Sequence, residues 1–307
     1  MNELEEIFKV QKEFNDKYFR EQQNVDDVTK MSIDDKIKWS KEFIFSSSKE
    51  LYEMIDELQW KKHRFICKTN NIDNFLEEGI DAFKFLLNLF LVHGCDSTAF
   101  FQKFVDKSKV VDIRYNQEKK LKELKSKKDI KLAVLDIDGI ICSHSVEFLR
   151  GTTYNTIYEF KNDDINLYNE KKYSFRVSGI KRNLPVKPYV YNFLQTLKNK
   201  GYLILLLSAR PYEKFIRIYA DTLYWLENND IKYDFLFFNK NKEQFIIDNV
   251  LPEQVKFCVD DGIDNVNKLS LYFKTYLLPN YYLYDKRELF KVKNDVQIID
   301  TFNNIQL

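Results

Sequence analysis

The sequence predicts an all-α region followed by an α/β region built on a parallel β-sheet. Before Lys131 the chain has no proline and only two glycines, Gly79 and Gly94, and its apolar residues recur at helical spacing. After Lys131, short apolar runs such as KLAVLDID, YLILLLSARP and VKFCVDD alternate with helical stretches. That alternation is typical of parallel strands joined by crossover helices. We therefore expect a helical domain at 1–118 and an α/β domain at 130–307.

Helical spacing marks two elements of the first region. Leu51 and Leu58 belong to one apolar stripe, and Phe75 and Leu87 lie in a second helical segment. The segment 119–129, KKLKELKSKKD, contains six lysines and no bulky apolar residue beyond two leucines. We expect it to be a solvated helix or linker rather than a basic binding patch, because such charge runs are usually solvated.

Composition excludes several classes of protein. A formal net charge of +1 gives no reason to expect nucleic acid or an acidic membrane as the main partner. The four cysteines contain no CxxC pair, as is typical of reduced thiols, and His63, His93 and His144 have no partners at ligand spacing, so we expect them to be structural or exposed. The N-terminus has acids where a signal peptide needs bases, and no apolar stretch reaches membrane-spanning length. We therefore expect a cytoplasmic protein.

Polar residues stand where several of the predicted strands end or where the next helix begins. The carboxyl ends of parallel strands meet at one edge of a sheet, and ligands bind beyond that edge. Two carboxylates directly after a buried strand also need a compensating metal or a set of donors. The residues expected to gather there are Asp136, Asp138, Ser208, Lys242, Asp260 and Asp261.

These residue types fit phosphoryl transfer. One aspartate attacks phosphorus, a second handles the leaving-group proton, and a hydroxyl and a lysine hold the phosphate oxygens. Along the chain these residues form four motifs: Asp136 with Asp138, then Ser208, then Lys242, then Asp260 with Asp261. In this order they resemble the haloacid dehalogenase (HAD) superfamily of aspartate-nucleophile phosphatases over about residues 130–290. The resemblance implies a HAD-like Rossmannoid domain in which Asp136 is the nucleophile and Asp138 the general acid/base. It also implies that Ser208 and Lys242 bind the phosphate.

The same resemblance implies a Mg²⁺ site. Its ligands would be Asp136, Asp260, Asp261 and the main-chain carbonyl of Asp138, since oxygen ligands suit this ion. The phosphate-binding lysine has one alternative, Lys240, which stands two residues before Lys242. We prefer Lys242 because a helix-like run follows it directly.

Two further segments bear on the substrate. The insertion at about 145–185 is small, polar and aromatic, and it looks like a minimal cap that leaves the site open to more than a tiny substrate. The stretch from SARP to DFLFF resembles nucleotide-directed HAD enzymes, including the 3′-phosphatase domain of phage polynucleotide kinase. Within it, Arg210 either touches substrate or forms a structural ion pair.

Paired acids also occur in the helical region. Glu50 and Glu53 are three residues apart and share a helix face. Glu78 and Asp81 are three apart in NFLEEGIDAFKFLLNLFLVHG, which is apolar nearly all round. Carboxylates on so apolar a helix need a partner, and a second acidic helix with divalent cations would provide one.

The ExxE and ExxD pairs resemble the all-α NTP pyrophosphatase superfamily over about residues 5–118. The match is to the dimeric dUTPase and phage dCTPase group, with MazG-like enzymes more distant. This resemblance implies a homodimer formed through the helical domain. It also implies a Mg²⁺ site with the ligands Glu50, Glu53, Glu78 and Asp81.

Substrate-binding residues of the helical domain follow from the same resemblance. Lys107 and Arg114 match the family's phosphate-binding lysine and arginine by spacing. Gln11, Asn15 and Trp60 fall where base-pocket residues are expected. The sequence departs from the family pattern around the arginine, since a valine replaces the asparagine three residues earlier and the following glycine-tyrosine is absent.

Together these features predict a bifunctional nucleotide hydrolase. The helical domain would cleave a dNTP, with dUTP favoured, to dNMP and pyrophosphate, and the HAD-like domain would remove the remaining phosphate. One alternative is a HAD phosphatase alone, acting on a nucleotide or a polynucleotide 3′-end, with the helical half as a dimerisation and substrate-selection module. The other alternative, a nucleic-acid end-repair phosphatase whose helical half binds a strand, is disfavoured by the near-zero net charge.

Overall fold

The chain divides into two compact units, each described by itself. The computed structural model describes residues 2–58, 60, 71–127, 129–215 and 217–307. The units are Met1–Ser108 and Lys109–Leu307. Their division falls inside helix α4 (Ser97–Leu124), whereas the sequence placed the end of the helical domain at 118.

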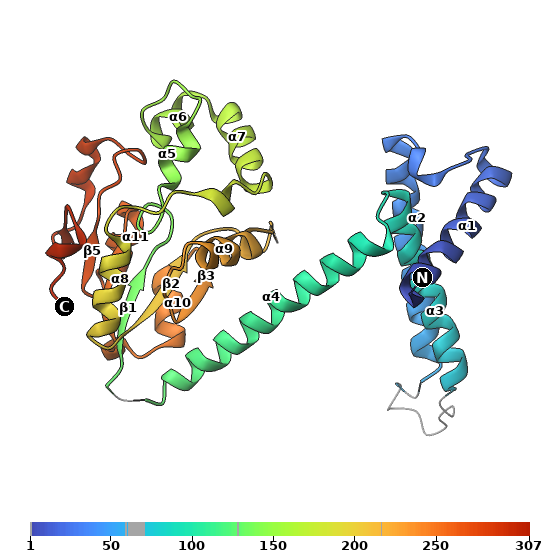
Figure 1. Ribbon diagram of the computed structural model, residues 1–307, viewed down its shortest axis with the longest axis horizontal. Helices are drawn as coiled ribbons and strands as arrows, with labels where there is room; N and C mark the ends of the chain where they lie inside the picture. The colour runs from blue at the N-terminus through green and yellow to red at the C-terminus, as the bar shows by residue number, and fades with distance from the viewer. Residues whose placement is uncertain (1, 59, 61–70, 128, 216) are drawn as a thin grey trace. The chain divides into compact units, whose positions relative to one another are not determined.

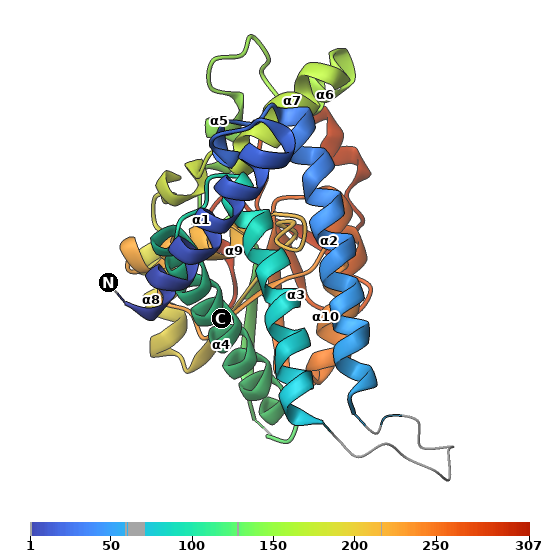
Figure 2. The same cartoon turned by 90° about the vertical axis from the view of Figure 1, so that its right-hand side faces the viewer.

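The regular elements in the described part of the first unit are helices. They are α1 (Glu3–Gln23), η1 (Val28–Lys30), α2 (Ile33–Asp56), α3 (Ile72–Val92) and the first turns of α4. A short polar residue precedes each of these helices, and the side chains of Asn2, Asp27, Ser32, Asn71 and Asp96 each accept a hydrogen bond from a backbone N–H of the first turn. Helices α2 and α3 run alongside each other (Figures 1 and 2).

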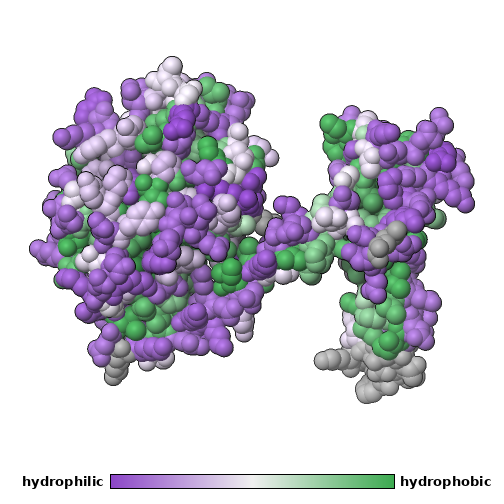
Figure 3. Space-filling model, viewed as in Figure 1, coloured by the Kyte–Doolittle hydropathy of each residue, from purple (hydrophilic) through white to green (hydrophobic). Residues whose placement is uncertain are grey.

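The core of the helical unit is small for its content of apolar residues. One cluster contains Phe19, Phe43 and Val92, and another contains Phe8 and Leu87. Many other large apolar side chains of this unit remain in contact with solvent, and Figure 3 shows hydrophobic residues on its surface. Those exposed by more than half include Phe14, Ile33, Phe45, Tyr52, Ile72, Leu76, Phe101 and Phe104.

The second unit is a parallel sheet covered on both faces. Its strands are β1 (Lys131–Leu135), β2 (Tyr202–Ser208), β3 (Phe235–Phe238), β4 (Val255–Asp260), β5 (Thr275–Leu277) and β6 (Val296–Ile298), in the order β3-β2-β1-β4-β5-β6. Every described pairing between these strands is parallel. Together with the helical first unit, this confirms the predicted fold class.

Alternate residues of the central strands point to opposite sides of the sheet, so both faces are buried. Ala133 and Leu135 pack on the side of helices α8 (Val190–Asn199) and α9 (Arg217–Asn228). Leu132 and Val134 pack on the side of α10 (Lys242–Asn249) and α11 (Ile263–Leu269). This explains why the strand sequences are continuous apolar runs.

The lysine-rich segment is the end of α4 and the turn that follows it. Leu121 and Leu124 are buried against the α10 side of the sheet, while the described lysines of the segment are exposed. The Gln117 side chain accepts a hydrogen bond from Leu236 N at 2.8 Å, and Gln254 Nε2 donates to Leu124 O at 2.7 Å. The last turns of α4 are thereby fixed to the α/β unit.

The insertion after β1 folds as a group of short helices. They are α5 (His144–Leu149), α6 (Ile157–Asp163), α7 (Ile165–Val177) and η2 (Ile180–Asn183), and they lie beyond the end of β1 in Figure 1. Phe148, Phe160, Tyr168 and Phe175 form their aromatic core, with ring centroids 5.4 to 6.3 Å apart. This group is the predicted cap. Among the described residues, none of the helices combines the length and apolar character needed to cross a membrane.

Candidate active site

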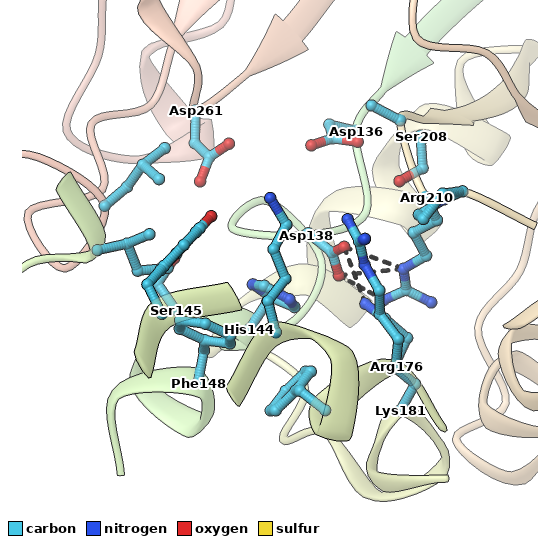
Figure 4. Close-up of a pocket in the computed structure, with 17 residues that line it drawn as sticks. Asp136, Asp138, His144, Ser145, Phe148, Arg176, Lys181, Ser208, Arg210 and Asp261 are labelled. Carbon is cyan, nitrogen blue, oxygen red and sulfur yellow. Dashed lines mark hydrogen bonds and ion pairs between the residues drawn. The ribbon is translucent and has the colours of Figure 1, made fainter. Parts of the chain in front are cut away.

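The strand ends bring the predicted phosphoryl-transfer residues together. Asp136 follows β1, Asp260 ends β4, and these two strands are neighbours at the point where the strand order reverses. Ser208 ends β2, on the other side of β1. All three side chains are buried. A cavity of about 240 Å³ opens between these strand ends and the cap (Figure 4), and its walls include Asp136, Asp138, Ser208, Arg210 and Asp261.

The glycine that follows Asp136 and Asp138, in the sequence DIDG, is required by a close approach. Gly139 has φ +85°, and a Cβ atom built on it would lie 1.6 Å from Asp261 Oδ2 and 2.9 Å from Asn280 Nδ2. Any other residue would displace the carboxylate of Asp261 as well as adopt a strained backbone. Gly139 therefore lets the backbone lie directly against the carboxylate of Asp261.

Three buried carboxylates meet at this edge of the sheet. Asp136, Asp260 and Asp261 each offer an oxygen that lies within 4.8 Å of the others. Lys242 Nζ stands between two of them, 2.9 Å from Asp136 Oδ1 and 2.6 Å from Asp260 Oδ2, and is itself buried. The alternative lysine, Lys240, is exposed. The structure thus places Lys242 rather than Lys240 at the carboxylates.

Amide groups that the sequence reasoning missed complete this arrangement. Asn265 Nδ2 donates to Asp260 Oδ1 at 3.0 Å, and the backbone N–H of Gly262 donates to the same oxygen at 2.8 Å. Asn280 Nδ2 donates to Asp261 Oδ2 at 2.6 Å. A signal for Asn280 was present, since it follows the apolar run that forms β5 and therefore lies at the same edge of the sheet.

The negative charge of the carboxylate cluster is only partly balanced, since two cations, Lys242 and Lys187, act on its three carboxylates. Burial raises the pKa of Asp136 to about 6; Lys242 opposes this change and Asp260 adds to it. Burial, followed by the charge of Asp260, raises the pKa of Asp261 well above its usual range. Asp136 Oδ1 also accepts no well-aligned hydrogen bond from the described residues. Clustered oxygen donors whose negative charge exceeds the nearby positive charge fit a hard divalent cation, so these residues suit Mg²⁺.

Asp138 stands in a different environment. Arg210 Nε donates to its two carboxylate oxygens at 3.1 and 3.0 Å, and Lys181 Nζ lies 3.2 Å from Oδ2 (Figure 4). Although burial opposes it, Arg210 leads a group of charges that hold the pKa of Asp138 well below its usual range. Burial lowers the pKa of Lys181 to about 8. Arg210 therefore forms the structural ion pair that was one of its two predicted roles, and it also lines the cavity.

The cap contributes residues that the sequence reasoning did not assign to the site. His144 lies against Phe148 and Phe175, with ring centroids 6.1 and 5.2 Å away, and burial lowers its pKa to about 3. Lys172 and Arg176 also line the cavity. No motif marked these residues, because the cap sequence is an aromatic and polar mixture whose contacts depend on how it folds back over the sheet.

In the helical unit, three of the four predicted metal ligands come together. Glu50, Glu53 and Glu78 each offer an oxygen within 4.8 Å of the others, from α2 and α3. Partial burial, followed by a hydrogen bond with Glu50, raises the pKa of Glu78. Asp81 is not part of this group and instead accepts a hydrogen bond at 2.9 Å from Lys84, one turn further along α3.

The predicted base-pocket residues have partners of their own. Gln11 and Asn15 are buried, and their amide nitrogens donate to Asn88 Oδ1 at 2.7 and 2.9 Å. They join α1 to α3 through a buried amide cluster. The Trp60 indole N–H donates to Asp56 Oδ1 at 3.0 Å. His63 and the rest of the KKHR segment after Trp60 lie outside the described residues.

The predicted phosphate ligands of the helical domain fall in different units. Lys107 is exposed on the part of α4 that belongs to the first unit. Arg114 belongs to the second unit, where its guanidinium carbon lies 5.4 Å from the centre of the Tyr212 ring and a nitrogen lies 3.8 Å from Glu118. The structure therefore does not bring Arg114 together with the acidic group inside one compact unit.

Neither family models nor curated proteins gave a match to this sequence. Solved structures similar to its C-terminal part include D,D-heptose 1,7-bisphosphate phosphatase from Burkholderia thailandensis, which is 13% identical with a TM-score of 0.37 and covers 56% of this chain and 93% of that chain. A haloacid dehalogenase-like family protein from Streptococcus pneumoniae is 11% identical, with a TM-score of 0.40 and coverages of 58% and 97%. A dehalogenase is 14% identical, with a TM-score of 0.38 and coverages of 58% and 96%. These three similarities do not extend to the helical unit.

Proposed function

We propose that the α/β unit is a Mg²⁺-dependent phosphomonoesterase that works through an aspartyl-phosphate on Asp136. The observation that carries this proposal is the position of Lys242 between Asp136 and Asp260, in a cluster of three buried carboxylates beside Ser208. A carboxylate at the floor of a cavity, flanked by a fixed ammonium group and a hydroxyl, is suited to attack an anionic phosphate.

The reaction has two steps. A carboxylate oxygen of Asp136 forms a bond to phosphorus, and the bond from phosphorus to the leaving oxygen breaks, so the leaving group takes up a proton. Water then attacks the phosphorus of the aspartyl-phosphate, gives up a proton, and releases inorganic phosphate and the free carboxylate. Ser208 and Lys242 hold the phosphate oxygens in both steps. Asp136, Asp260, Asp261 and the carbonyl of Asp138 would hold Mg²⁺, which neutralises the phosphate charge when bound.

Asp138 is assigned the proton transfers. Its ionised state beside Arg210 and Lys181 suits the second step, in which it accepts the proton of the attacking water. Donation in the first step requires that Asp138 first take up a proton. An incoming phosphate dianion would favour this, because its negative charge opposes ionisation of the carboxylate.

The test of this function is release of inorganic phosphate by the full chain. Phenyl phosphate, deoxynucleoside 5′-monophosphates and a 3′-phosphorylated oligonucleotide would each be supplied with Mg²⁺ and again with excess EDTA. We propose nucleoside monophosphates as the substrate class, from the resemblance of the segment after Ser208 to nucleotide-directed enzymes. Phosphate release from the oligonucleotide alone would favour the 3′-end alternative. Release that is unaffected by EDTA would contradict the metal assignment.

A second candidate function concerns the helical unit. The meeting of Glu50, Glu53 and Glu78 supports the proposal that this unit hydrolyses a dNTP, with dUTP favoured, to dNMP and pyrophosphate in the presence of Mg²⁺. The product would be a phosphomonoester, which is the substrate of the other site. The pairing of Asp81 with Lys84 leaves one of the four predicted ligands outside the group.

Glu78→Gln is expected to lower pyrophosphate release from dUTP by on the order of a hundredfold, because the amide removes one charge from a metal-binding group. Phosphate release from a monophosphate should be unchanged. The matched control is Glu77→Gln, which changes the exposed neighbouring residue. If both variants kept the wild-type rate on dUTP, Glu78 would be an ordinary surface acid and the helical unit would have only a structural or selective role.

We also propose that the helical unit forms a homodimer. Ile72, Leu76, Ile80 and Phe83 are spaced along one face of α3 and are all exposed by more than a third. A second copy would cover this apolar stripe. Light scattering should show a dimer at micromolar concentration, and Leu76→Glu should shift it toward the monomer, while Tyr281→Glu in the α/β unit should not. A monomeric wild-type protein would contradict this assembly.

A further inference from the structure

Two cations of the cap face the candidate active site. Lys172 and Arg176 are one turn apart on α7, so they lie on one face of that helix, and both line the cavity that contains Asp136. Both side chains are partly buried. Arg176 reaches toward the strand ends from the cap side in Figure 4. Long cationic side chains that were merely solvated would be expected to point away from a cavity.

These two cations have no acidic partner in the part of the chain that the structure describes. No carboxylate oxygen there lies within 4.0 Å of either side-chain charge. Their described neighbours are aromatic: Lys172 Nζ is 4.9 Å from the centre of the Tyr168 ring, and Arg176 Cζ is 5.3 Å from that of Phe215. Burial lowers the pKa of Arg176, as expected where a cation loses water without gaining a counter-ion.

The other cations around the cavity are already matched. Lys242 faces Asp136 and Asp260, while Lys181 and Arg210 face Asp138. For the remaining carboxylate, Asp261, the cation that acts on it is Lys187. The charges of a bound Mg²⁺ and a phosphate dianion would cancel each other. Lys172 and Arg176 therefore have no anionic partner, either among the described residues or in the transferred phosphate.

We infer that Lys172 and Arg176 bind a second anionic group, carried by the leaving group of the substrate. Within the proposed nucleotide class, the preferred substrates are then phosphomonoesters that bear a further phosphate or carboxylate, such as a nucleoside 3′,5′-bisphosphate, and simple nucleoside monophosphates are poorer substrates. This inference rests on the proposed phosphatase function. The transferred phosphate is held at the strand ends by Ser208 and Lys242, whereas these cations come from the cap, on the side where a leaving group must lie.

The test compares two substrates that differ in one anionic group, deoxythymidine 3′,5′-bisphosphate and deoxythymidine 5′-monophosphate. The measured quantity is the ratio of kcat/KM for the bisphosphate to kcat/KM for the monophosphate, both from phosphate release with Mg²⁺. In the wild type this ratio should exceed one. Lys172→Gln and Arg176→Gln should each lower it by about tenfold, the usual scale for loss of one charged hydrogen bond. Arg176→Lys should retain part of the preference.

Lys161→Gln is the matched control, because Lys161 is an exposed cap lysine that does not line the cavity. It should leave the ratio unchanged. Higher KCl should lower the ratio in the wild type and have less effect in the two glutamine variants. A wild-type ratio of one or less, or ratios within twofold of the wild type in both variants, would overturn the inference while leaving the phosphatase function intact. Absence of phosphate release from any monoester in the wild type would contradict both the inference and the proposed phosphatase function.

Discussion

Asp136→Asn is expected to abolish phosphate release from phosphomonoesters, by on the order of a thousandfold or more. The amide has almost the shape of the carboxyl group but is a far poorer nucleophile, so no phosphoryl intermediate forms. The measurement is steady-state phosphate release from the best monoester substrate with Mg²⁺. Asp295→Asn changes an exposed acid away from the cavity and should keep the wild-type rate.

The same variant separates the two proposed sites. Asp136 belongs to the α/β unit and the group of Glu50, Glu53 and Glu78 belongs to the helical unit. Pyrophosphate release from dUTP should therefore persist in Asp136→Asn. If it fell as far as phosphate release, one site would serve both reactions and the proposal of two sites would be wrong. If phosphate release survived, Asp136 would not be the nucleophile.

The α/β fold and the floor of its candidate site could be predicted because both depend on local sequence patterns. Each central strand is buried on both faces, so its sequence is a continuous run of apolar residues. The first polar residue after that run marks the end of the strand. Asp136, Ser208 and Asp260 all follow this rule, and parallel pairing then brings them to one edge. The need for a glycine at position 139 was not predicted, because it depends on the close approach of Asp261 from another segment.

The remaining site residues could not be predicted because their positions depend on contacts between distant segments. Lys181 reaches Asp138 only after the cap has folded back over the strand ends, and no strand or motif precedes it. The positions of Lys172 and Arg176 at the cavity depend on the folding of the cap in the same way. The sequence does show that they are one turn apart, but not which face of α7 meets the cavity. That orientation follows from the packing of Phe148, Tyr168 and Phe175, which form the core of the cap.

For the helical unit, spacing predicted which acids share a face but not their partners. Glu50, Glu53 and Glu78 meet as expected, whereas Asp81 pairs with Lys84, a neighbour that helical spacing equally allows. The C-terminal boundary of the helical unit could not be predicted for a related reason. α4 continues through the lysine-rich segment, and only the burial of Leu121 and Leu124 fixes its end to the sheet.

Lys242→Met is expected to be the most destabilising single change at the site. Its ammonium group is buried 2.9 Å from Asp136 and 2.6 Å from Asp260, and together these carboxylates raise its pKa despite the opposing effect of burial. Removing one partner of such a group leaves uncompensated buried charge, which costs about 3–5 kcal/mol of unfolding free energy. Phosphate release should also fall by a hundredfold or more, because a fixed charge opposite the phosphate is lost.

The loss of stability should depend on pH and on Mg²⁺, and this distinguishes loss of charge from loss of packing. The pKa of Asp136 is raised to about 6 in the folded protein, so folding favours its protonated form and its ionisation lowers stability as pH rises toward 6. Without Lys242 that pKa should rise further. The deficit of the variant, measured by urea unfolding without metal, should therefore be largest above pH 6 and should shrink at pH 5, where Asp136 is protonated.

Mg²⁺ should reduce the deficit at pH 7.5, since it supplies positive charge to the same carboxylates. Lys240→Met is the control, as it removes the exposed lysine two positions earlier and should change neither stability nor phosphate release. A deficit of equal size at pH 5 and pH 7.5, unaffected by Mg²⁺, would show that Lys242 stabilises the fold only through the packing of its aliphatic stem. The assignment of Lys242 to the phosphate would then have no electrostatic support.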